Sequence, residues 1–372
     1  MKLKSKLSVF LLSVVFGFVS CNTEEPSTQE ESSVAVKSKS NSLSKVGNCA
    51  QVPGWASQNG GTTGGGSAAE TLVTTYAQLK AAIENKNVKI VKVSGTINIP
   101  SGGRISFQDQ IGKTIYGASG AKLVSTDQSK DKSGIIYIKR CNNIIIRNLI
   151  FDGPGAYDVD GWDNCTLDDS KNVWIDHCEF RDGVDGNLDF KNKTNFVSVT
   201  YTKFNYLKAP RAGGPGGSDD HRFSNLIGSG DSATGDRGTF KITFARCWWM
   251  QGCKARMPRV RFGQVHIVNS YFNSTASTYC IQAGFEANIR ITKNVFENVK
   301  YPVDLMDGKS TAVTVESNNI FTNTSGNKAG KNNAFTPPYS IVTLDASAVK
   351  ANITSSSTGA GANLGGNICG SF

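Results

Sequence analysis

The chain is poor in the residues from which protein zinc sites are built. It has only three histidines in 372 residues, and its nine cysteines include no C-x-x-C pair. Zinc sites use histidine and cysteine ligands at close, recurring spacings. The sequence therefore argues against a zinc hydrolase. His177 and His266 lie within apolar runs and are expected to be packed structural residues, whereas His221 falls in an irregular segment and receives no role.

Helical periodicity and hairpin turns are also scarce. One segment, TYAQLKAAIEN at 75–85, has Tyr76, Leu79 and Ile83 at helical spacing and predicts a short amphipathic helix. Beyond it, short β-branched runs alternate with turn residues. An antiparallel sandwich would show hairpin turns about every 8–12 residues, and a propeller would show a longer, four-stranded period. Neither pattern is present.

The apolar run at the start of the chain is too short to span a membrane as a mature helix. Residues 1–20 combine three lysines with mostly apolar residues and predict a secretory signal peptide. The ending VSC resembles a bacterial lipobox, in which Cys21 becomes the lipidated first residue. Residues 21–48, rich in Ser, Glu and Lys, predict a flexible tether to a folded domain at 49–372. We therefore expect a secreted protein, anchored by lipid at the bacterial outer membrane or cell surface.

Basic residues outnumber acidic ones. The formal net charge is +10, and removal of residues 1–20, with three lysines and no acid, leaves +7. Outside the cell this charge favours a polyanionic partner, although it would equally serve solubility. A nucleic-acid surface would continue its basic residues over a face with interleaved aromatics, but in KARMPRVRFGQVH (254–266) they stop at Arg261. We expect no nucleic-acid partner.

The cysteines leave the disulfide pattern open. Without Cys21 eight remain, an even number that permits disulfides in an exported protein without fixing their pairing. Cys49 and Cys369, near the two ends of the predicted domain, are candidates for a clasp. Several of the others are alternatively buried free thiols.

Segments that end in a large apolar residue recur at a nearly constant interval. They end at Phe151, Phe180, Phe204, Trp248, Phe272, Phe296 and Ile320, at intervals of 29, 24, 44, 24, 24 and 24 residues. A period in the low twenties, with strands in every repeat and no intervening helices, is typical of a parallel β-helix. We predict this all-β fold, with the Gly- and Pro-rich segment 209–222 as a loop inserted into the long interval. Trp248, at the core phase, is expected to be buried.

Several charged residues share one phase of the repeat. Counting back from each final apolar residue, Asp163 lies at position 17, Asp189 at 15 and Arg256 at 16. A β-helix stacks equivalent positions about 4.8 Å apart, so these side chains are expected to share a face. Asp185, at position 19, can converge with them, and Arg261, at 11, lies further round the coil. Converging carboxylates suit calcium better than zinc. The alternative is that DGNLD (185–189) is only an ordinary polar turn and binds no metal.

The motifs around these residues resemble a known family. GWDNCTLDDSKNVWIDHCEF, DGNLD, IGSGDS and RMPRVRFGQVHIVNSYF are similar in order, spacing and sequence to the pectate lyases of polysaccharide lyase family one, over roughly residues 60–330. The resemblance implies a right-handed, single-stranded parallel β-helix that cleaves polygalacturonate by β-elimination with calcium. It matches the three calcium aspartates to Asp163, Asp185 and Asp189. It also matches Arg256 to the proposed catalytic base and Arg261 to an arginine that binds a substrate carboxylate.

A further substrate-binding lysine of the family has no single counterpart. Family members carry it shortly before the GSxDS segment, where this chain has SDDHRF. Arg222 lies nearest, with a one-residue slip, whereas Lys208 occupies the place counted from the preceding strand. The insertion leaves both candidates open. Lys191, two residues after Asp189, either touches substrate or is solvated.

The implied chemistry fits these residue types. β-Elimination across C4–C5 of a galacturonate removes a proton alpha to a carboxylate, and a bound calcium ion withdraws charge from that carboxylate. Arginine normally stays protonated, so Arg256 acts as a base only where cations crowd it, which also predicts an alkaline optimum. We therefore predict a monomeric, calcium-dependent pectate lyase acting on de-esterified polygalacturonate.

Three alternatives compete with this prediction. Lyases for methyl-esterified pectin usually replace the calcium aspartates by basic groups, whereas this chain retains them. A β-helical hydrolase would use Asp185 and Asp189 as an acid and base pair. A non-catalytic pectate-binding surface β-helix would bind polygalacturonate without forming a product.

Overall fold

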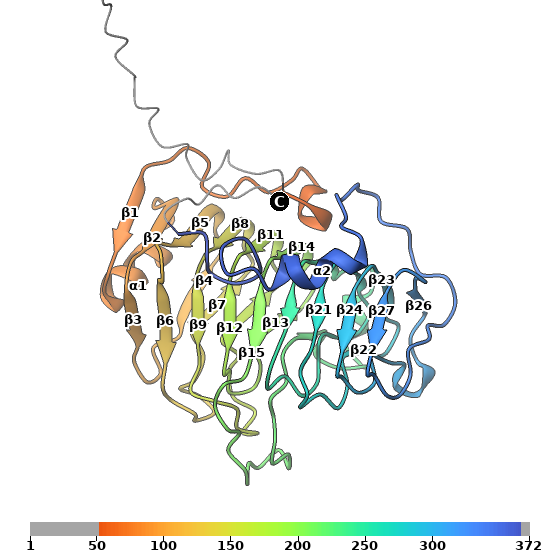
Figure 1. The fold of residues 1–372 in the computed structure, drawn as a ribbon. Coiled ribbons are helices and arrows are strands. Elements are labelled where there is room, and N and C mark those ends of the chain that lie inside the picture. Colours follow the sequence, from red (N-terminus) through yellow and green to blue (C-terminus); the bar gives the residue numbers. More distant parts are fainter. Residues whose placement is uncertain (1–51, 366–372) are drawn as a thin grey trace, which may run out of the picture. The chain divides into compact units, whose positions relative to one another are not determined.

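The repeating segments form successive coils of a right-handed parallel β-helix, as their period predicts. The computed structural model describes residues 52–365, which form three parallel sheets. Each complete coil contributes a strand to each sheet, and the colours of neighbouring strands follow the sequence from orange to blue (Figure 1). The predicted signal peptide and tether, with Cys21, Cys49 and Cys369, lie outside the described residues.

The strands are grouped here by sheet. Sheet A contains β1 (Glu70–Val73), β2 (Ile90–Val93), β5 (Ile111–Gly117), β8 (Asn142–Arg147), β11 (Lys171–Asp176), β14 (Asn195–Thr200), β17 (Lys241–Ala245), β20 (Gln264–Val268), β23 (Asn288–Thr292) and β26 (Ala312–Val315). Sheet B contains β3 (Thr96–Ile99), β6 (Lys122–Ser125), β9 (Ile150–Asp152), β12 (Glu179–Arg181), β15 (Lys203–Asn205), β18 (Trp248–Trp249), β21 (Tyr271–Phe272), β24 (Val295–Glu297) and β27 (Ile320–Thr322). Sheet C contains β4 (Ile105–Gln108), β7 (Ile136–Lys139), β10 (Cys165–Asp168), β13 (Leu188–Lys191), β16 (Leu226–Ile227), β19 (Arg259–Val260), β22 (Ile281–Ala283) and β25 (Val303–Asp304).

Helices are few in the described part of the chain. The α-helices are α1 (Tyr76–Glu84) and α2 (Ala346–Ile353), and the 3-10 turns are η2 (Gly54–Ser57), η3 (Thr234–Asp236) and η4 (Met306–Gly308). None of the helices between residues 52 and 365 is long and apolar enough to cross a membrane.

Helix α1 is the short amphipathic helix that the sequence predicts. It buries Leu79 and Ile83 in the core. Lys113, itself buried, donates from Nζ to the carbonyls of Ala82, Ile83 and Asn85 at 3.1, 2.6 and 2.9 Å, which satisfies the C-terminal end of the helix. Burial lowers the pKa of Lys113 to about 8.

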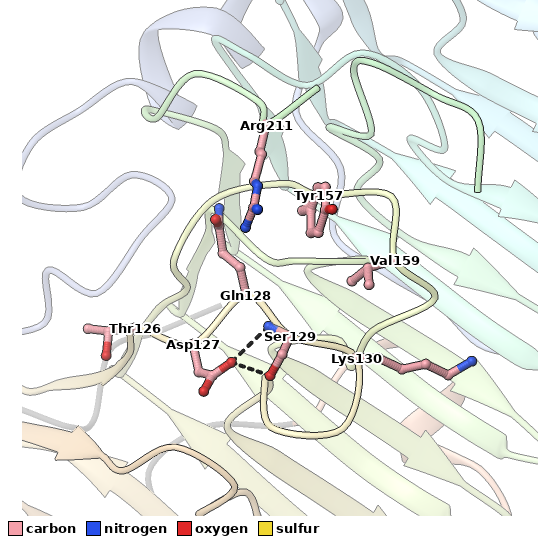
Figure 2. A pocket seen from close by; sticks show the side chains of 8 residues that line it. All are labelled: Thr126, Asp127, Gln128, Ser129, Lys130, Tyr157, Val159 and Arg211. Carbon is pink, nitrogen blue, oxygen red and sulfur yellow. Dashed lines mark hydrogen bonds between the residues drawn. The ribbon is translucent and has the colours of Figure 1, made fainter. Parts of the chain in front are cut away.

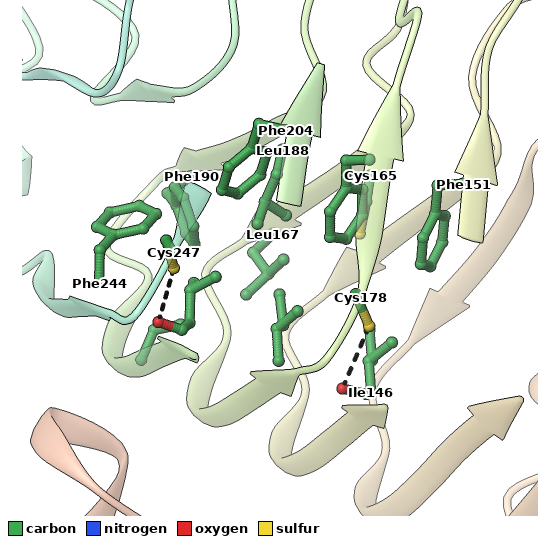
Figure 3. Packing of buried hydrophobic residues seen from close by; sticks show 14 of the residues in the cluster. Ile146, Phe151, Cys165, Leu167, Cys178, Leu188, Phe190, Phe204, Phe244 and Cys247 are labelled. Carbon is green, nitrogen blue, oxygen red and sulfur yellow. Dashed lines mark hydrogen bonds between the residues drawn. The ribbon is translucent and has the colours of Figure 1, made fainter. Parts of the chain in front are cut away.

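A stack of aromatic rings runs through the core from sheet B. Phe151, Phe180, Phe204, Trp249, Phe272, Phe296 and Phe321 follow one another in register, with centroids 4.4–5.9 Å apart. Figure 3 shows Phe204 beside Leu188 of sheet C, with Leu167 and Phe151 further along the same core. The stack joins the coils through hydrophobic burial and through ring packing.

The predictions that Trp248 and Ile320 occupy the core phase are each wrong by one residue, because Trp249 and Phe321 take these places in the stack. Trp249 pairs with Phe204 and is fully buried, whereas Trp248 is half-buried and packs against Tyr271. Adjacent residues of a strand point to opposite faces, so only one of two consecutive tryptophans can enter the core. Trp249 has an acceptor there, because its Nε1 donates to Asn225 Oδ1 at 2.8 Å.

The long interval in the repeat is a single coil with an inserted loop, as predicted. Strand β14 pairs directly with β17, and β15 with β18, so no strand intervenes. The insertion is the green loop that extends beyond the neighbouring turns (Figure 1).

The cysteines of the described region are buried free thiols. They are Cys141, Cys165, Cys178, Cys247, Cys253 and Cys280. Burial raises the pKa of the Cys141 thiol to about 11 and that of Cys178 to about 12, so both are poor nucleophiles.

The segments around Trp55 and Tyr339 both cover sheet A. Trp55 of η2 stacks on Phe335, with ring centroids 5.9 Å apart. Tyr339 Oη lies 2.7 Å from Thr243 Oγ1 and 3.1 Å from His266 Nδ1. His266 is therefore a packed structural residue, as the sequence predicts.

Replacement of the two tryptophans should separate their roles. We expect Trp249→Ala to lower the free energy of unfolding by about 3–5 kcal/mol, because it opens a cavity in the aromatic stack. Trp248→Ala should cost clearly less, since Trp248 is only half-buried. Denaturant titration of both variants measures the difference, and equal losses would contradict the register.

The stability of the fold should fall in mild acid through His266. Burial, with a smaller effect of Arg290, lowers the pKa of His266 to about 4. In the unfolded chain the imidazole of His266 is protonated below about pH 6.5, whereas in the folded chain it stays neutral down to about pH 4. The free energy of unfolding therefore falls as the pH drops from about 6.5 towards 4, by about 2 kcal/mol at pH 5. His266→Gln should lose less stability than the parent between pH 7 and 5. Equal losses in thermal unfolding would rule out His266 as the cause.

Candidate active site

The outer face of sheet C carries one continuous row of side chains from neighbouring coils. In strand order the row contains Tyr137, Thr166, Asp189, Leu226, Arg259, Gln282 and Asp304. The alternate residues, among them Leu167, Phe190 and Val260, are buried in the core. The parallel register therefore places Asp189 and Arg259, which are 70 residues apart in sequence, only two strands apart.

Two of the predicted aspartates meet beside Gly186. Asp163 and Asp189 are each 1% exposed, and Asp163 Oδ1 and Asp189 Oδ2 are buried without a hydrogen-bond partner. A side chain on Gly186 would place its first carbon 2.8 Å from Asp163 Oδ1 and 2.9 Å from Asp189 Oδ1. The remaining carboxylate oxygens accept from Thr166 Oγ1 at 2.7 Å and from Leu226 N at 2.9 Å.

The electrostatics of this pair favour a cation. Burial and the neighbouring Asp163 raise the pKa of Asp189 well above its ordinary value, and the charges of Lys191 and Arg256 oppose this rise only in part. Lys191 Nζ lies 3.5 Å from Asp163 Oδ2, and Asp163 is the largest cause that raises the pKa of Lys191. Buried carboxylate oxygens without partners are ligands that suit a hard ion such as calcium, so the residues fit the metal that the motifs imply.

The third predicted ligand, Asp185, points to a different partner. Asp185 Oδ1 lies 3.0 Å from His221 Nε2, and His221 Nδ1 lies 3.1 Å from Asp158 Oδ1. Asp158 in turn holds the inserted loop by accepting from Ser218 N at 2.7 Å. Although burial raises the pKa of Asp185, the hydrogen bond and charge of His221 more than compensate and lower it. Within residues 52–365, no group of three His, Cys, Asp or Glu side chains is arranged to enclose an ion, so the expected convergence of three aspartates is incomplete.

Arg256 lies at an irregularity in the stacking of β19 on β16. Phe223 pairs with Ala255 and Leu226 with Arg259, so the segment that contains Arg256 is one residue longer than its neighbour. Arg256 takes up the extra residue with φ of 56°, and its guanidinium lies 4.7 Å from the centroid of the Phe223 ring. Such a bulge redirects a side chain towards a site. The charge of Arg256 lowers the pKa of Asp185 and opposes the rise in the pKa of Asp189, so Arg256 acts on two of the aspartates with which the repeat groups it.

Arg259 is a site residue that the sequence pattern did not reveal. It borders a cavity of about 200 Å³ together with Arg256, Tyr279 and Gln282, and its Nε is buried without a partner. Burial, followed by the charges of Arg261 and Arg256, lowers the pKa of Arg259 to about 10. The signal available in the sequence was the alternation Arg259-Val260-Arg261, because an apolar Val260 that faces the core leaves its neighbour Arg259 facing outward.

The candidate substrate-binding residues fall into two groups. Lys191 is the last residue of β13, and Arg261 directly follows β19, both in sheet C. Arg261 Nε donates to Asp231 Oδ1 at 2.8 Å. Lys208 instead donates to the Gly153 carbonyl and lies 3.3 Å from Asp152 Oδ1. Arg222 Nε and Nη2 donate to Asp220 at 2.7 Å each. All four candidates therefore have partners within the chain, since Lys191 lies 3.5 Å from Asp163.

A separate pocket lies among the loops that precede sheet C. It has a volume of about 570 Å³ and is bordered by Asp127, Tyr157 and Arg211 among others. Figure 2 shows Arg211 reaching over Tyr157, while Asp127 accepts from Ser129. None of the predicted site residues borders this pocket, so it is distinct from the row on sheet C.

Comparison with known proteins agrees with the fold and the motifs. The family model described as pectate lyase matches residues 32–363. The chain is 32% identical over 353 residues to a pectate trisaccharide-lyase of Bacillus licheniformis, which covers 91% of this chain and 92% of that protein. It is 33% identical over 253 residues to a probable pectate lyase B of Aspergillus terreus, covering 66% and 68%.

Solved structures show the same fold. A pectate lyase from Paenibacillus sp. 0602 superposes with a TM-score of 0.68 at 21% identity, covering 84% of this chain and 96% of that one. A pectate lyase bound to a hexasaccharide superposes with a TM-score of 0.66 at 23% identity, covering 84% and 97%. The family model, which spans most of the sequence, and the relative from Bacillus licheniformis establish that the chain belongs to the pectate lyase family and is a polysaccharide lyase.

Proposed function

We propose that this chain is a calcium-dependent lyase that cleaves de-esterified polygalacturonate by β-elimination to 4,5-unsaturated oligogalacturonates. The observation that carries the proposal is the buried Asp163–Asp189 pair, with unpartnered carboxylate oxygens, on a face that also holds several arginines. Carboxylates attract a divalent cation, and arginines attract the carboxylates of a polyuronate. A relative that bears the name pectate trisaccharide-lyase and a similar structure bound to a hexasaccharide support a polysaccharide substrate.

Asp163 and Asp189 are the residues that would hold calcium. Asp185 would join them as a third ligand, as the family resemblance implies, only by leaving His221. When bound, calcium would draw charge from the substrate carboxylate and so acidify the neighbouring C5 proton. Its charge would also relieve the repulsion between the two buried carboxylates.

Arg256 would accept the C5 proton. The C5–H electrons then form the C4–C5 double bond, the C4–O4 bond breaks, and the departing oxygen takes a proton from water. Arg256 must be deprotonated for this step, and a crowd of cations is the condition that favours it. Arg261 and Lys191 would bind substrate carboxylates in exchange for Asp231 and Asp163. Lys208 or Arg222 would likewise contribute only after leaving its present partners.

The location proposed for the enzyme rests on its first residues. The signal-like segment 1–20 and the lipobox-like Cys21 support an exported protein tethered by lipid at the outer membrane or cell surface. Incorporation of labelled palmitate into the chain, and its loss in Cys21→Ser, would test this anchor.

Polygalacturonate should yield an unsaturated product in a metal-dependent way. We expect ultraviolet absorbance of the 4,5-unsaturated product to rise with calcium and to stop with a chelator, because the aspartate pair needs its cation. Saturated products alone would identify a hydrolase, and equal rates with chelator would overturn the role of calcium.

Replacement of the proposed base should abolish turnover while leaving the fold intact. We expect Arg256→Lys to lower kcat by about 10²-fold or more, since a flexible ammonium cannot reproduce the position of the guanidinium. Arg237→Gln is the matched control, because Arg237 is exposed and already paired with Glu286. Near-parental activity of Arg256→Lys would remove Arg256 as the base.

A further inference from the structure

A second cationic site lies on the same outer face, on the other side of the aspartate pair from Arg256. Arg104 directly precedes β4, and its side chain runs close past Gly134, where the first carbon of any added side chain would lie 3.1 Å from Arg104 Cδ. The guanidinium carbon of Arg104 lies 3.5 Å from the centroid of the Trp162 ring and 4.7 Å from that of Tyr137. We call Arg104, Trp162 and Tyr137 the Arg104 cluster.

The Arg104 guanidinium has aromatic partners but no anionic one. Between residues 52 and 365 it makes no hydrogen bond and no ion pair, although it is half-buried. Two rings lie close to its face, and a guanidinium in such a stack still presents its N–H groups at the edge. Burial lowers the pKa of Arg104 while the charge of Asp163 raises it.

The cluster is aligned with the candidate active site. Tyr137 belongs to the same outer row as Thr166 and Asp189, so it lies two strand spacings, about 10 Å, from Asp189. Trp162 is the residue before Asp163. Lys139, at the end of β7, adds a second cation 5.8 Å from the Tyr137 ring. A polymer lying across the strands at the aspartate pair would therefore reach Arg104.

We infer that the Arg104 cluster is a subsite that binds the carboxylate of an unesterified uronate. In the bound polysaccharide this uronate lies outside the sugar units that contact the aspartate pair. This inference rests on the proposed function. The planar guanidinium can donate two parallel N–H groups to a carboxylate, and the rings hold it in place before substrate arrives. A methyl ester carries no charge and offers a poorer acceptor, so the subsite selects de-esterified chain.

The test is binding to polysaccharide in the absence of turnover. In the Arg256→Lys background with calcium, electrophoresis through gels containing polygalacturonate measures affinity from the retardation of the protein. We expect Arg104→Gln to weaken binding about tenfold, as expected for loss of a charge-assisted hydrogen-bonded pair. Arg237→Gln, which makes the same chemical change at an exposed and already paired arginine, should leave retardation unchanged.

A second substrate separates binding from a structural role. In gels of highly methyl-esterified pectin, Arg104→Gln and its parent should be retarded equally. Equal weakening in both gels, or a loss of thermal stability that accounts for the change, would mean that Arg104 only supports Trp162 and would overturn the subsite.

Kinetics keep the inference distinct from the proposed function. In the otherwise unaltered enzyme, Arg104→Gln should raise KM for polygalacturonate about tenfold and leave KM unchanged for the shortest oligogalacturonate that is cleaved. Absence of product from the unaltered enzyme would defeat the proposed function. Weaker retardation of the Arg104→Gln variant in polygalacturonate gels would still support the subsite in that case. Normal product together with unchanged KM and retardation in Arg104→Gln would defeat the subsite alone.

Discussion

The parallel register between successive coils is the constraint on which the functional face depends. Cys165 pairs with Leu188 and Leu226 with Arg259, so each coil of sheet C repeats the inward and outward positions of the one before it. The inward positions build the hydrophobic core and bury most of its apolar surface. Since that burial fixes the register, it also fixes the outer row. Polar residues from distant parts of the sequence become neighbours without making any direct contribution to the core.

Several polar atoms on the outer face of sheet C remain without partners although groups of opposite charge lie nearby. Asp163 and Asp189 retain buried oxygens without partners, although Lys191 and several arginines lie on the same face. Arg259 likewise retains an unpartnered Nε. Unpaired buried charges are costly to stability, so a fold that keeps them gains by binding external partners. A divalent cation would complete the carboxylates, and a polyuronate would complete the arginines. The same substrate therefore satisfies both groups once calcium is present.

Much of this arrangement could be predicted from the sequence because it follows from a period. The low-twenties repeat gives the parallel β-helix, the inserted loop, and the shared face of Asp163, Asp189 and Arg256. Features that depend on a single residue of register could not be predicted in this way. The sequence does not distinguish Trp248 from Trp249, and only the pairing of Trp249 with Phe204 assigns one of them to the core.

Contacts made by side chains in loops were equally hidden. Asp185 has the spacing of a metal ligand, but His221, brought in by the insertion, lies beside its carboxylate. The conformation of a Gly-rich loop is not encoded in a strand period, so this contact left no sequence signal. Arg104 was missed for a related reason. Its partners, Trp162 and Tyr137, come from two other coils, and no motif includes all three.

The central claim is that the Asp163–Asp189 pair is a calcium site, and a crystal structure of the protein grown with calcium tests it most directly. We predict density for one cation about 2.3–2.6 Å from an oxygen of each aspartate, with Lys191 moved away from Asp163. Calcium bound elsewhere, or an unchanged Lys191–Asp163 contact in crystals of an enzyme that forms product with calcium, would contradict the account.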